Sequence, residues 1–421
     1  MCRLRRRVEA AVLAVLVIAS AAWRSKNDLV TTLFTQPPPC AYTALGGGFL
    51  IYVVKPGDTL YSLSRQYGKS VLELARLNQI PDPNILVQGQ ALLIPEGEKT
   101  GALTKEVGGY AYPFISPWVL RETLPYLNLL NVFSYGFTPE GDLLPPPLSD
   151  DAMLQQARSS NVPAALVLTP LGRDGNFSNY LISALLNNAP AQKKLFEQLQ
   201  QVMTQKGYRE LNIDFEYIPA ADRDKFTDFI RMAKETLSFP ISVCLAPKNS
   251  PAQRGVLFDG KDYEAIGKIA DRVLLMTYEW GYKYGPPQAV APINRVREVI
   301  EYAVSVIPKE KILLGLANYG YDWPLPYQRG RTVARTIGPV EAVEIARRER
   351  TNIIFDNPTQ SPWLQYTDYN GQRHVVWFED IRSWEQKLNL VEQYDLAGVG
   401  IWTIMPFFRP GYVLVNDRFR S

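Results

Sequence analysis

The residues best suited to chemistry in this 421-residue chain are three polar side chains that alternate with apolar ones within residues 209–216. Successive side chains of a β-strand point to opposite faces, so a strand here puts Asn212, Asp214 and Glu216 on one face. Such groups cost free energy in an apolar strand unless they have partners or a function. A carboxyl in an apolar pocket beside another carboxyl keeps its proton to higher pH. The segment therefore predicts general acid catalysis by a carboxyl.

The rare residues of the chain exclude other chemistries. A single histidine, His374, nearly rules out a Ser-His-Asp triad and a zinc site of several histidines. Cys2, Cys40 and Cys244 lack metal-ligand spacing and imply no disulfide framework, and we expect Cys244 to be a small buried side chain. We expect no metal and no cofactor. The net charge of +3, from 45 Lys+Arg and 42 Asp+Glu, is too small to indicate nucleic-acid binding.

From residue 110 to 421, strand-like runs alternate with amphipathic helical stretches. This alternation predicts a (β/α)8 TIM barrel, with a doubly wound sheet as the alternative. The expected strands cover residues 129–135, 164–168, 210–215, 241–246, 272–277, 311–316 and 398–403. Catalytic groups of such barrels lie at the C-terminal ends of the strands. We therefore expect Glu216 at the mouth of the barrel, Asp214 one step deeper and Asn212 deeper again.

One segment, at about residues 322–378, breaks this alternation. It contains a helical stretch at residues 338–349 and a hairpin that turns at Asn370 and Gly371. We expect a small α+β insertion between the seventh and eighth barrel strands.

Residues 1–48 indicate a signal-like or anchor segment followed by a linker. Four arginines precede an apolar run at residues 10–22, which is too short to span a bilayer comfortably. Runs of three prolines and three glycines follow it. We expect an exported protein associated with the cell wall or spore, and an uncleaved membrane anchor is the alternative.

Residues 49–96 form a second, smaller unit of expected β-α-α-β order. Thr59 and Ser70 are suited to cap its two helices, and Asn78 ends the second helix. The runs at residues 52–60 (YVVKPGDTL) and 87–90 (VQGQ), together with Asn78, resemble a LysM domain. This resemblance implies binding of glycans that contain N-acetylglucosamine. The groove would lie between two loops and would contain Gly57, Asp58, Thr59, Asn84, Ile85 and Leu86.

Three segments of the larger unit resemble family 18 glycoside hydrolases. Residues 209–216 resemble the family's DxxDxDxE strand, most closely in the spore-germination branch, where Asn commonly takes the second acidic position. Residues 276–279 (MTYE) resemble its Met-x-Tyr-Asp/Glu motif, and Trp402 matches the tryptophan that forms the floor of the sugar pocket. Arg209 departs from the family's first Asp. Because this position starts the strand, we expect changed support of the strand rather than lost activity.

The resemblance implies a substrate-assisted retaining mechanism, which is an exception to the scheme of two catalytic carboxylates. Glu216 would protonate the leaving oxygen, Asp214 would orient the substrate's acetamido group, and Tyr278 would bind the acetamido oxygen. Three further residues of the motifs are expected to bind substrate: Asn212, Glu279 and Trp402. Tyr135 is suited either to the glycan cleft or to the core, and we assign it to the cleft.

These features together predict a peptidoglycan-binding glycosidase, an endo-β-N-acetylglucosaminidase that cleaves N-acetylglucosamine linkages in spore cortex fragments. One alternative is a chitinase acting on chitin oligomers, and another is a chitinase-like lectin that binds the wall without catalysis. The presence of Glu216 favours an enzyme. The expected partner is peptidoglycan or another glycan that contains N-acetylglucosamine, with no nucleic acid and no obligate protein partner.

Overall fold

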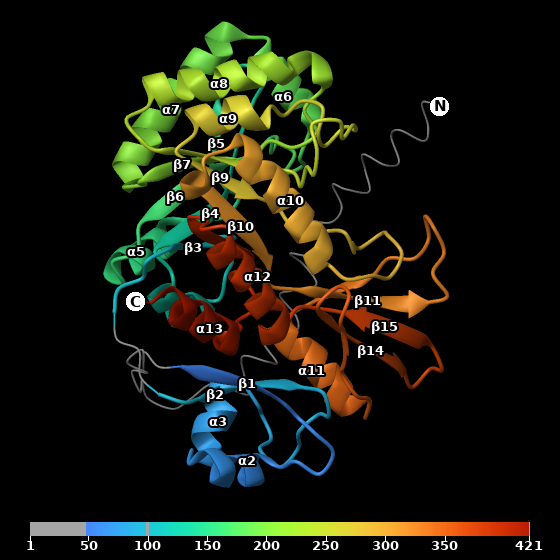
Figure 1. Cartoon of the computed structure of the whole chain (residues 1–421). Helices are drawn as coiled ribbons and strands as arrows, with labels where there is room; N and C mark the ends of the chain where they lie inside the picture. Colours follow the sequence, from blue (N-terminus) through green and yellow to red (C-terminus); the bar gives the residue numbers. More distant parts are fainter. Residues whose placement is uncertain (1–47, 98–100, 421) are drawn as a thin grey trace.

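The computed structural model describes residues 48–97 and 101–420, and its largest part is a closed barrel of eight parallel strands (Figure 1). The last strand pairs with the first, so the ring has no free edge. The strands are β3 (Glu106–Ala111), β4 (Leu129–Phe137), β6 (Ala164–Leu168), β7 (Glu210–Ile213), β8 (Ile241–Leu245), β9 (Arg272–Leu275), β10 (Ile312–Ala317) and β16 (Gly398–Trp402). The predicted (β/α)8 fold is confirmed, and the doubly wound alternative is wrong because an open sheet would have two edges.

The first barrel strand, β3, begins at Glu106, four residues before the position where we expected the barrel to begin. Two glycines hid it, because a strand interior seldom contains them. They allow close packing. A side chain at Gly109 would approach Leu127 and Ile404 to 2.8 and 2.7 Å, and one at Gly108 would approach Asn131 to 3.2 Å.

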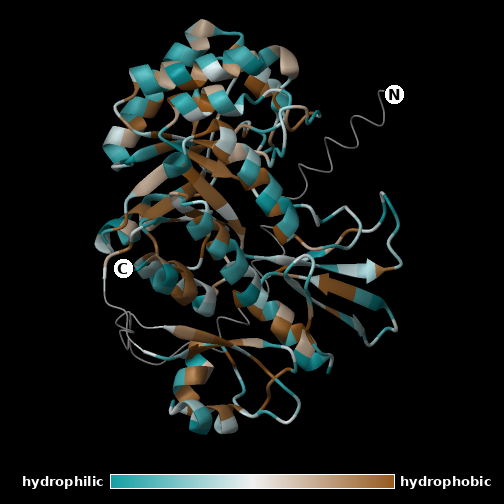
Figure 2. Ribbon diagram, viewed as in Figure 1, coloured by the Kyte–Doolittle hydropathy of each residue, from teal (hydrophilic) through white to brown (hydrophobic). Residues whose placement is uncertain are grey.

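Helices between the strands surround the barrel, and the apolar strands lie inside (Figure 2). The helices are α4 (Pro117–Thr123), α5 (Asp151–Ser159), α6 (Asn179–Leu186), α7 (Ala189–Lys206), α8 (Arg223–Thr236), α9 (Tyr263–Ile269), α10 (Ile293–Val306), α12 (Ile381–Gln393) and α13 (Arg409–Phe419). Short elements at the loops are β5 (Leu143–Leu144), η1 (Leu124–Tyr126), η2 (Ala220–Asp222) and η3 (Lys309–Lys311).

The expected insertion lies between β10 and β16 and forms an antiparallel sheet of five strands with one helix. Its elements are β11 (Gly320–Leu325), β12 (Arg335–Ile337), α11 (Pro339–Arg348), β13 (Ile354–Asp356), β14 (Ser361–Thr367) and β15 (Arg373–Trp377). The helix and the hairpin turn are confirmed. Gly371 adopts φ +79°, and Asp368 accepts a hydrogen bond from the amide of Gln372 across the turn.

The small unit at the N-terminal side has the expected order β1 (Phe49–Val53), α2 (Leu60–Tyr67), α3 (Val71–Leu77) and β2 (Ala91–Pro95). The side chains of Thr59 and Ser70 cap α2 and α3 by accepting hydrogen bonds from the amides of Ser62 and Glu73. Both helices have complete capping boxes, which stabilise helices as short as these.

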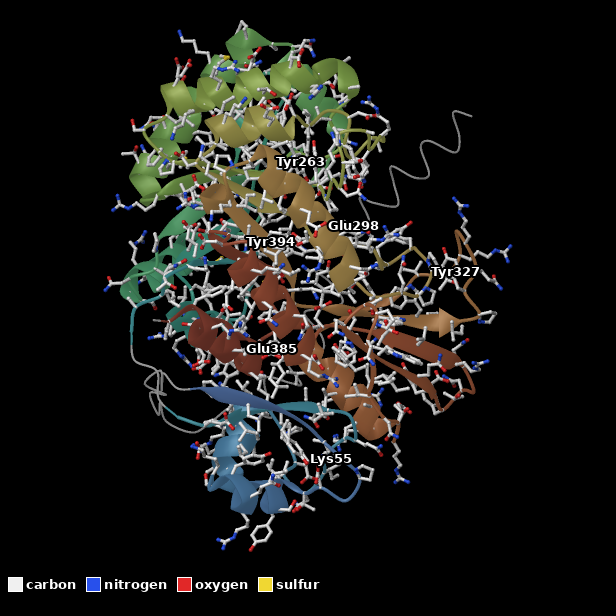
Figure 3. All side chains as sticks on the ribbon, viewed as in Figure 1. Lys55, Tyr263, Glu298, Tyr327, Glu385 and Tyr394 are labelled. Carbon is white, nitrogen blue, oxygen red and sulfur yellow. The ribbon has the colours of Figure 1, made fainter. Side chains whose placement is uncertain are left out.

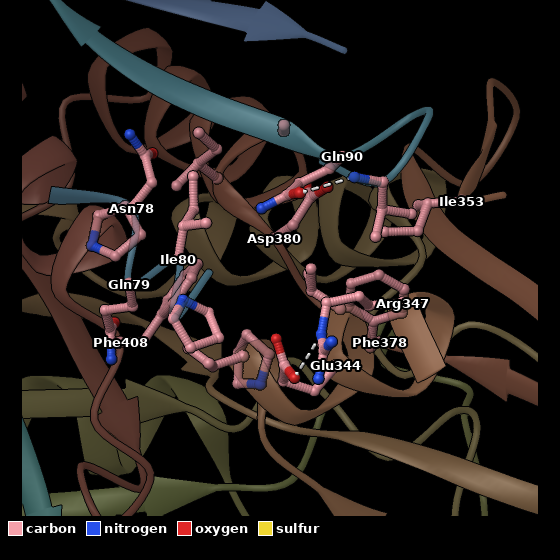
Figure 4. A pocket seen from close by; sticks show the side chains of 18 of the residues that line it. Asn78, Gln79, Ile80, Gln90, Glu344, Arg347, Ile353, Phe378, Asp380 and Phe408 are labelled. Atoms are coloured by element: carbon pink, nitrogen blue, oxygen red, sulfur yellow. Dashed lines mark hydrogen bonds and ion pairs between the residues drawn. The ribbon is translucent and has the colours of Figure 1, made fainter. Parts of the chain in front are cut away.

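This small unit is docked against both the barrel and the insertion (Figure 1). The Gln79 side chain donates to the Phe407 carbonyl at 3.1 Å and accepts from the Arg409 amide at 2.6 Å. The Ile353 amide donates to the Gln88 carbonyl at 2.9 Å, and Val87 joins the apolar core of the insertion. A pocket remains at this junction, between the small unit and α11 (Figure 4).

A glycine at the junction provides a test of the docking. Gly89 has φ +83°, and a Cβ there would lie 1.8 Å from the Ile353 carbonyl oxygen. We expect Gly89→Ala to separate the small unit from the insertion, which limited proteolysis of the full chain would detect as faster release of that unit. Gly68→Ala is the matched control, because Gly68 also has positive φ but nothing within 4 Å of its Cβ position. Both variants lose about 1 kcal/mol from backbone strain, so equal release rates would contradict the docking.

Candidate active site

The predicted carboxyls belong to the three residues that follow β7, at the mouth of the barrel. The amide of Asp214 donates to the Leu168 carbonyl at 2.9 Å, which extends the pairing with β6 by one residue. On the opposite face, the ring of Phe215 stacks on Phe226 and Phe229 of α8, with centroids 5.9 and 5.7 Å apart. This packing holds the apolar face against α8 and turns Asp214 and Glu216 to the inside, as the alternation predicted.

Asp214 and Glu216 share a poorly solvated environment. The pKa of Asp214 is raised mainly by burial and then by the charge of Glu216, and the pKa of Glu216 is raised mainly by burial. Asp214 Oδ1 is buried and has no hydrogen-bond partner among the residues that the structure describes. The pair is therefore suited to keep one proton near neutral pH and to accept a hydrogen bond from a ligand.

Tyr278, which follows β9, reaches into the same space. Its side chain is 8% exposed, and Gly315 on β10 makes room for it, because a Cβ there would lie 2.8 Å from the ring. Burial raises the pKa of Tyr278 far above its ordinary value. The hydroxyl is therefore neutral and able to donate a hydrogen bond.

Glu279, the next residue, is held by the insertion. Its Oε1 accepts hydrogen bonds from the hydroxyls of Tyr319 at 2.5 Å and Tyr321 at 2.7 Å. Burial raises the pKa of Glu279 to about 6, while the two tyrosine hydroxyls lower it. The insertion thus orients one carboxyl of the barrel mouth.

Trp402 lies at the C-terminal end of β16 and is partly exposed. Its ring meets Phe133 edge to face at a centroid distance of 4.8 Å, and it contacts Tyr110 and Tyr112 at 5.7 and 6.2 Å. These contacts fix the ring among the aromatic side chains inside the barrel, and its role as a pocket floor stays a prediction.

The assignment of Tyr135 to the glycan cleft is wrong. Its side chain is 1% exposed, its hydroxyl donates to Asp150 at 2.6 Å, and its ring lies 6.0 Å from that of Tyr208. The pairing of β4 with β6 shifts register between Phe133 and Tyr135. This bulge changes the face to which the later residues point, so Tyr135 packs outside the barrel.

The assignment of Asn212 to substrate binding is also wrong. The side chain is 1% exposed, and it donates to Ser242 Oγ at 2.8 Å and accepts from Cys244 Sγ at 3.3 Å. It lies one layer below Asp214 and is held by β8. Cys244 is buried as expected. Arg209 is exposed just before β7, at the end of the strand away from Asp214 and Glu216, as predicted.

Several residues at the mouth of the barrel were not predicted from the sequence. Tyr110 and Tyr112 alternate at the end of the strand β3 that the glycines hid, and Tyr319 and Tyr321 alternate around the start of the insertion. Alternation was the available signal for both pairs. Lys261, whose charge acts on Asp214 and Glu216, lies in a loop and had no such signal.

In the small unit, the two predicted glycan loops meet at their bases, where Val54 pairs with Gly89 and Gln90 through backbone hydrogen bonds. The side chain of Asp58 accepts from the Tyr52 hydroxyl and the Lys55 amide, both at 2.7 Å. The remaining groove residues are placed as follows: Gly57 in the turn at φ +84°, Thr59 at the cap of α2, Asn84 bonded to Asp82, Ile85 42% exposed and Leu86 partly buried.

Residues 48–97 and 101–420 contain neither a candidate metal site nor a candidate membrane-spanning helix. These residues include no group of three or more His, Cys, Asp or Glu side chains that could hold a metal ion, and none of their helices is long and apolar enough to cross a membrane. The signal-like or anchor segment lies outside the described residues. The pocket of Figure 4 is lined by none of the predicted catalytic residues, so it is distinct from the active site.

Comparisons with known proteins agree with this geometry. The model of glycosyl hydrolases family 18 matches residues 152–405, and the LysM domain model matches residues 52–95. The chain is 38% identical to the cortical fragment-lytic enzyme of Bacillus subtilis (strain 168), over 88% of this chain and 98% of that protein. It is 37% identical to the enzyme of the same name from Bacillus anthracis, over 87% and 98%. The crystal structure of the Bacillus megaterium QM B1551 spore cortex-lytic enzyme SleL superimposes with a TM-score of 0.83 at 32% identity, covering 89% of this chain and 99% of that one.

Two tyrosines test the placement of the site. Tyr278→Phe removes a hydroxyl that faces Asp214 and Glu216, and we expect kcat to fall at least about tenfold. Tyr135→Phe removes a hydroxyl that faces Asp150, and we expect unchanged kcat and KM with unfolding made easier by about 1–3 kcal/mol. Steady-state kinetics and denaturant unfolding of both variants would check this. A loss of activity in Tyr135→Phe at preserved stability would contradict the placement.

The raised pKa of Glu216 also predicts how stability depends on pH. The folded state holds a proton that the unfolded state releases near pH 4.5, so stability falls as pH rises from that value to the raised pKa. We expect Glu216→Gln to remove this loss and to raise Tm by about 2 °C at pH 8, with little change at pH 4. Glu298→Gln on α10 (Figure 3) is the control. The side chain of Glu298 is 41% exposed and pairs with Arg295, so it is not desolvated as Glu216 is. Equal changes at both pH values would contradict the burial penalty.

Proposed function

The chain belongs to glycosyl hydrolase family 18, carries a LysM domain and is a glycosidase that acts on peptidoglycan, and we propose that it cleaves N-acetylglucosamine linkages in spore cortex fragments by substrate-assisted retaining catalysis. The observation that carries this proposal is the arrangement at the end of β7. Asp214 and Glu216 follow one strand on one side, beside Tyr278, while Trp402 lies at the end of another strand of the same barrel. This arrangement suits an acid and an orienting carboxylate better than two carboxylates on opposite sides of a sugar.

In the first step, protonated Glu216 donates its proton to the glycosidic oxygen, and the bond to the anomeric carbon breaks. The acetamido carbonyl oxygen of the same sugar attacks that carbon from the other side and forms an oxazolinium ion. Asp214 accepts the hydrogen bond of the acetamido N–H and stabilises the positive charge. Its buried Oδ1, which has no partner among the described residues, is free for this contact.

In the second step, the carboxylate of Glu216 takes a proton from water as the water attacks the anomeric carbon. The acetamido group re-forms, and the configuration is retained because the carbon was inverted twice. The proton then remains on Glu216, ready for the next turnover.

Three further side chains bind the sugar. The Tyr278 hydroxyl donates to the acetamido oxygen and holds it near the anomeric carbon. Trp402 supports the apolar face of the ring from below. Glu279 uses Oε1 for Tyr319 and Tyr321, which leaves Oε2 to accept from a sugar hydroxyl.

The LysM domain supplies the binding of the polymer. We propose that the loops of Gly57–Thr59 and of residues 84–86 hold an N-acetylglucosamine-containing strand while the barrel cleaves it. Two of the relatives are named for cortical fragments, and a third for the spore cortex. Peptidoglycan lies outside the cell membrane, so this function fits an exported, wall- or spore-associated protein.

Digestion of two substrates tests the proposal. We expect the wild-type enzyme to release cortex fragments with N-acetylglucosamine at their new reducing ends, identified by mass spectrometry after borohydride reduction. Glu216→Gln and Asp214→Asn should each lower kcat by about 10²-fold or more, because proton donation and charge stabilisation are lost. Glu298→Gln is the active control.

The other outcomes distinguish the alternatives. Cleavage of chitin oligomers with no cleavage of cortex fragments would assign a chitinase. Binding of both glycans without any cleavage would assign a lectin. Full activity of Glu216→Gln would show that another residue is the acid.

A further inference from the structure

Lys261, in the loop between β8 and α9, is a lysine that the mechanism above does not use. Its side chain is 2% exposed and ranks among the largest fully buried ones of the described chain. Its Nζ donates to the carbonyl oxygen of Cys244 at 3.3 Å, and it forms no ion pair within 4.0 Å among the described residues. A buried ammonium is costly unless nearby charges compensate it.

The loop around Lys261 is fixed on both sides. A Cβ at Gly260 would lie 2.2 Å from the Ile218 carbonyl oxygen, so this residue packs directly on the segment that follows Glu216. Tyr263, labelled in Figure 3, starts α9; its hydroxyl donates to the Ala246 carbonyl and accepts from the Lys248 amide. These contacts fix the chain on both sides of Lys261.

The register of the barrel brings the ammonium to the level of the catalytic carboxyls. Ile213 of β7 pairs with Val243 of β8, so the next residues along the two strands are Asp214 and Cys244. The carbonyl of Cys244 holds the Lys261 ammonium there. The carboxyl charges of Asp214 and Glu216 act on the ammonium in turn.

Other titratable groups also face the carboxyl pair. They come from β3 and the loop after it, from β8, from the segment after β7 and from the segment after β9: Tyr110, Tyr112, Cys244, Tyr217, Tyr278 and Glu279. Burial raises the pKa of each tyrosine and of the thiol, so these groups are neutral. Lys261 is thus the one cation that faces the pair from the described chain.

We propose that Lys261 is a positioning residue whose charge keeps Asp214 ionised while Glu216 holds the catalytic proton. This inference rests on the proposed function, because it assigns a role to the ionised form of Asp214. Asn212 cannot take over this role, since Ser242 and Cys244 occupy its amide. The trio of Lys261, Asp214 and Glu216 is neutral when it contains one carboxyl proton, which is the arrangement that the reaction requires.

The direction of the effect follows from the charges. Burial raises the pKa of both carboxyls, the charge of Glu216 raises that of Asp214 further, and the charge of Lys261 lowers the pKa of both. Without the cation, both carboxyls keep their protons to higher pH. Protonated Asp214 no longer carries the charge that stabilises the oxazolinium ion, so activity is lost on the acidic side of the pH profile.

The test is the pH profile of kcat/KM for Lys261→Met on cortex fragments. We expect the acidic limb to move up by about one pH unit, which lowers activity about tenfold at a pH on that limb. Lys261→Arg, which keeps the charge, should restore the limb toward its wild-type position. Lys248→Met is the matched control. Lys248 also follows β8 and is only 8% exposed, but the charges that act on it are those of Arg223, Arg254, Asp262 and Asp259 rather than the carboxyl pair.

A uniform loss at every pH, or an unmoved limb, would overturn the proposal. Failure of this proposal is distinguishable from failure of the proposed function. If Glu216→Gln is inactive but the acidic limb of Lys261→Met does not move, only the role of Lys261 is overturned. If Lys261→Met fails to fold, the variant Lys261→Met with Asp214→Asn provides the second test. If this double variant folds, the result supports compensation of the Asp214 charge by Lys261. If it also misfolds, that compensation is overturned.

Discussion

The burial of two carboxyls at the end of one strand is the constraint on which the rest of this structure depends. Asp214 and Glu216 are only partly exposed, and desolvation raises the pKa of both, so the pair is suited to hold a proton near neutral pH. Such a site opposes folding, because charges that are desolvated cost free energy. The fold offsets this with apolar packing behind the strand, where Phe215 stacks against two phenylalanines of α8.

The neighbouring strands adapt to this pair in specific ways. Gly315 on β10 leaves the volume that the ring of Tyr278 fills, and the aromatic side chains of β3 and β4 hold Trp402 at the end of β16. The insertion adds a functional contact as well as bulk, since its first residues supply the two tyrosine hydroxyls that orient Glu279. The barrel mouth is therefore assembled from six strands, which are β3, β4, β7, β9, β10 and β16, and from the start of one insertion.

The LysM domain is also part of this assembly. It contacts the barrel through Gln79 and Arg409 and the insertion through Val87 and Ile353, so it is held in one orientation relative to the catalytic carboxyls. A glycan bound by the domain would then reach the barrel at a defined distance. The same insertion contacts the LysM domain on one side and Glu279 on the other, so it connects the two units physically.

The sequence by itself determined the local features: the alternation that puts Asp214 and Glu216 inside, seven of the barrel strands, the helix caps of the LysM domain and the hairpin at Asn370. Each of these depends on residues close together in the chain, where side-chain period and turn chemistry act directly. Only the tertiary structure decided three others. The bulge in β4 directs Tyr135 away from the cleft, and side chains of β8 bind the amide of Asn212. The loop before α9 places Lys261 near the carboxyls. Contacts between strands and loops far apart in the chain set these positions, and no local pattern encodes them.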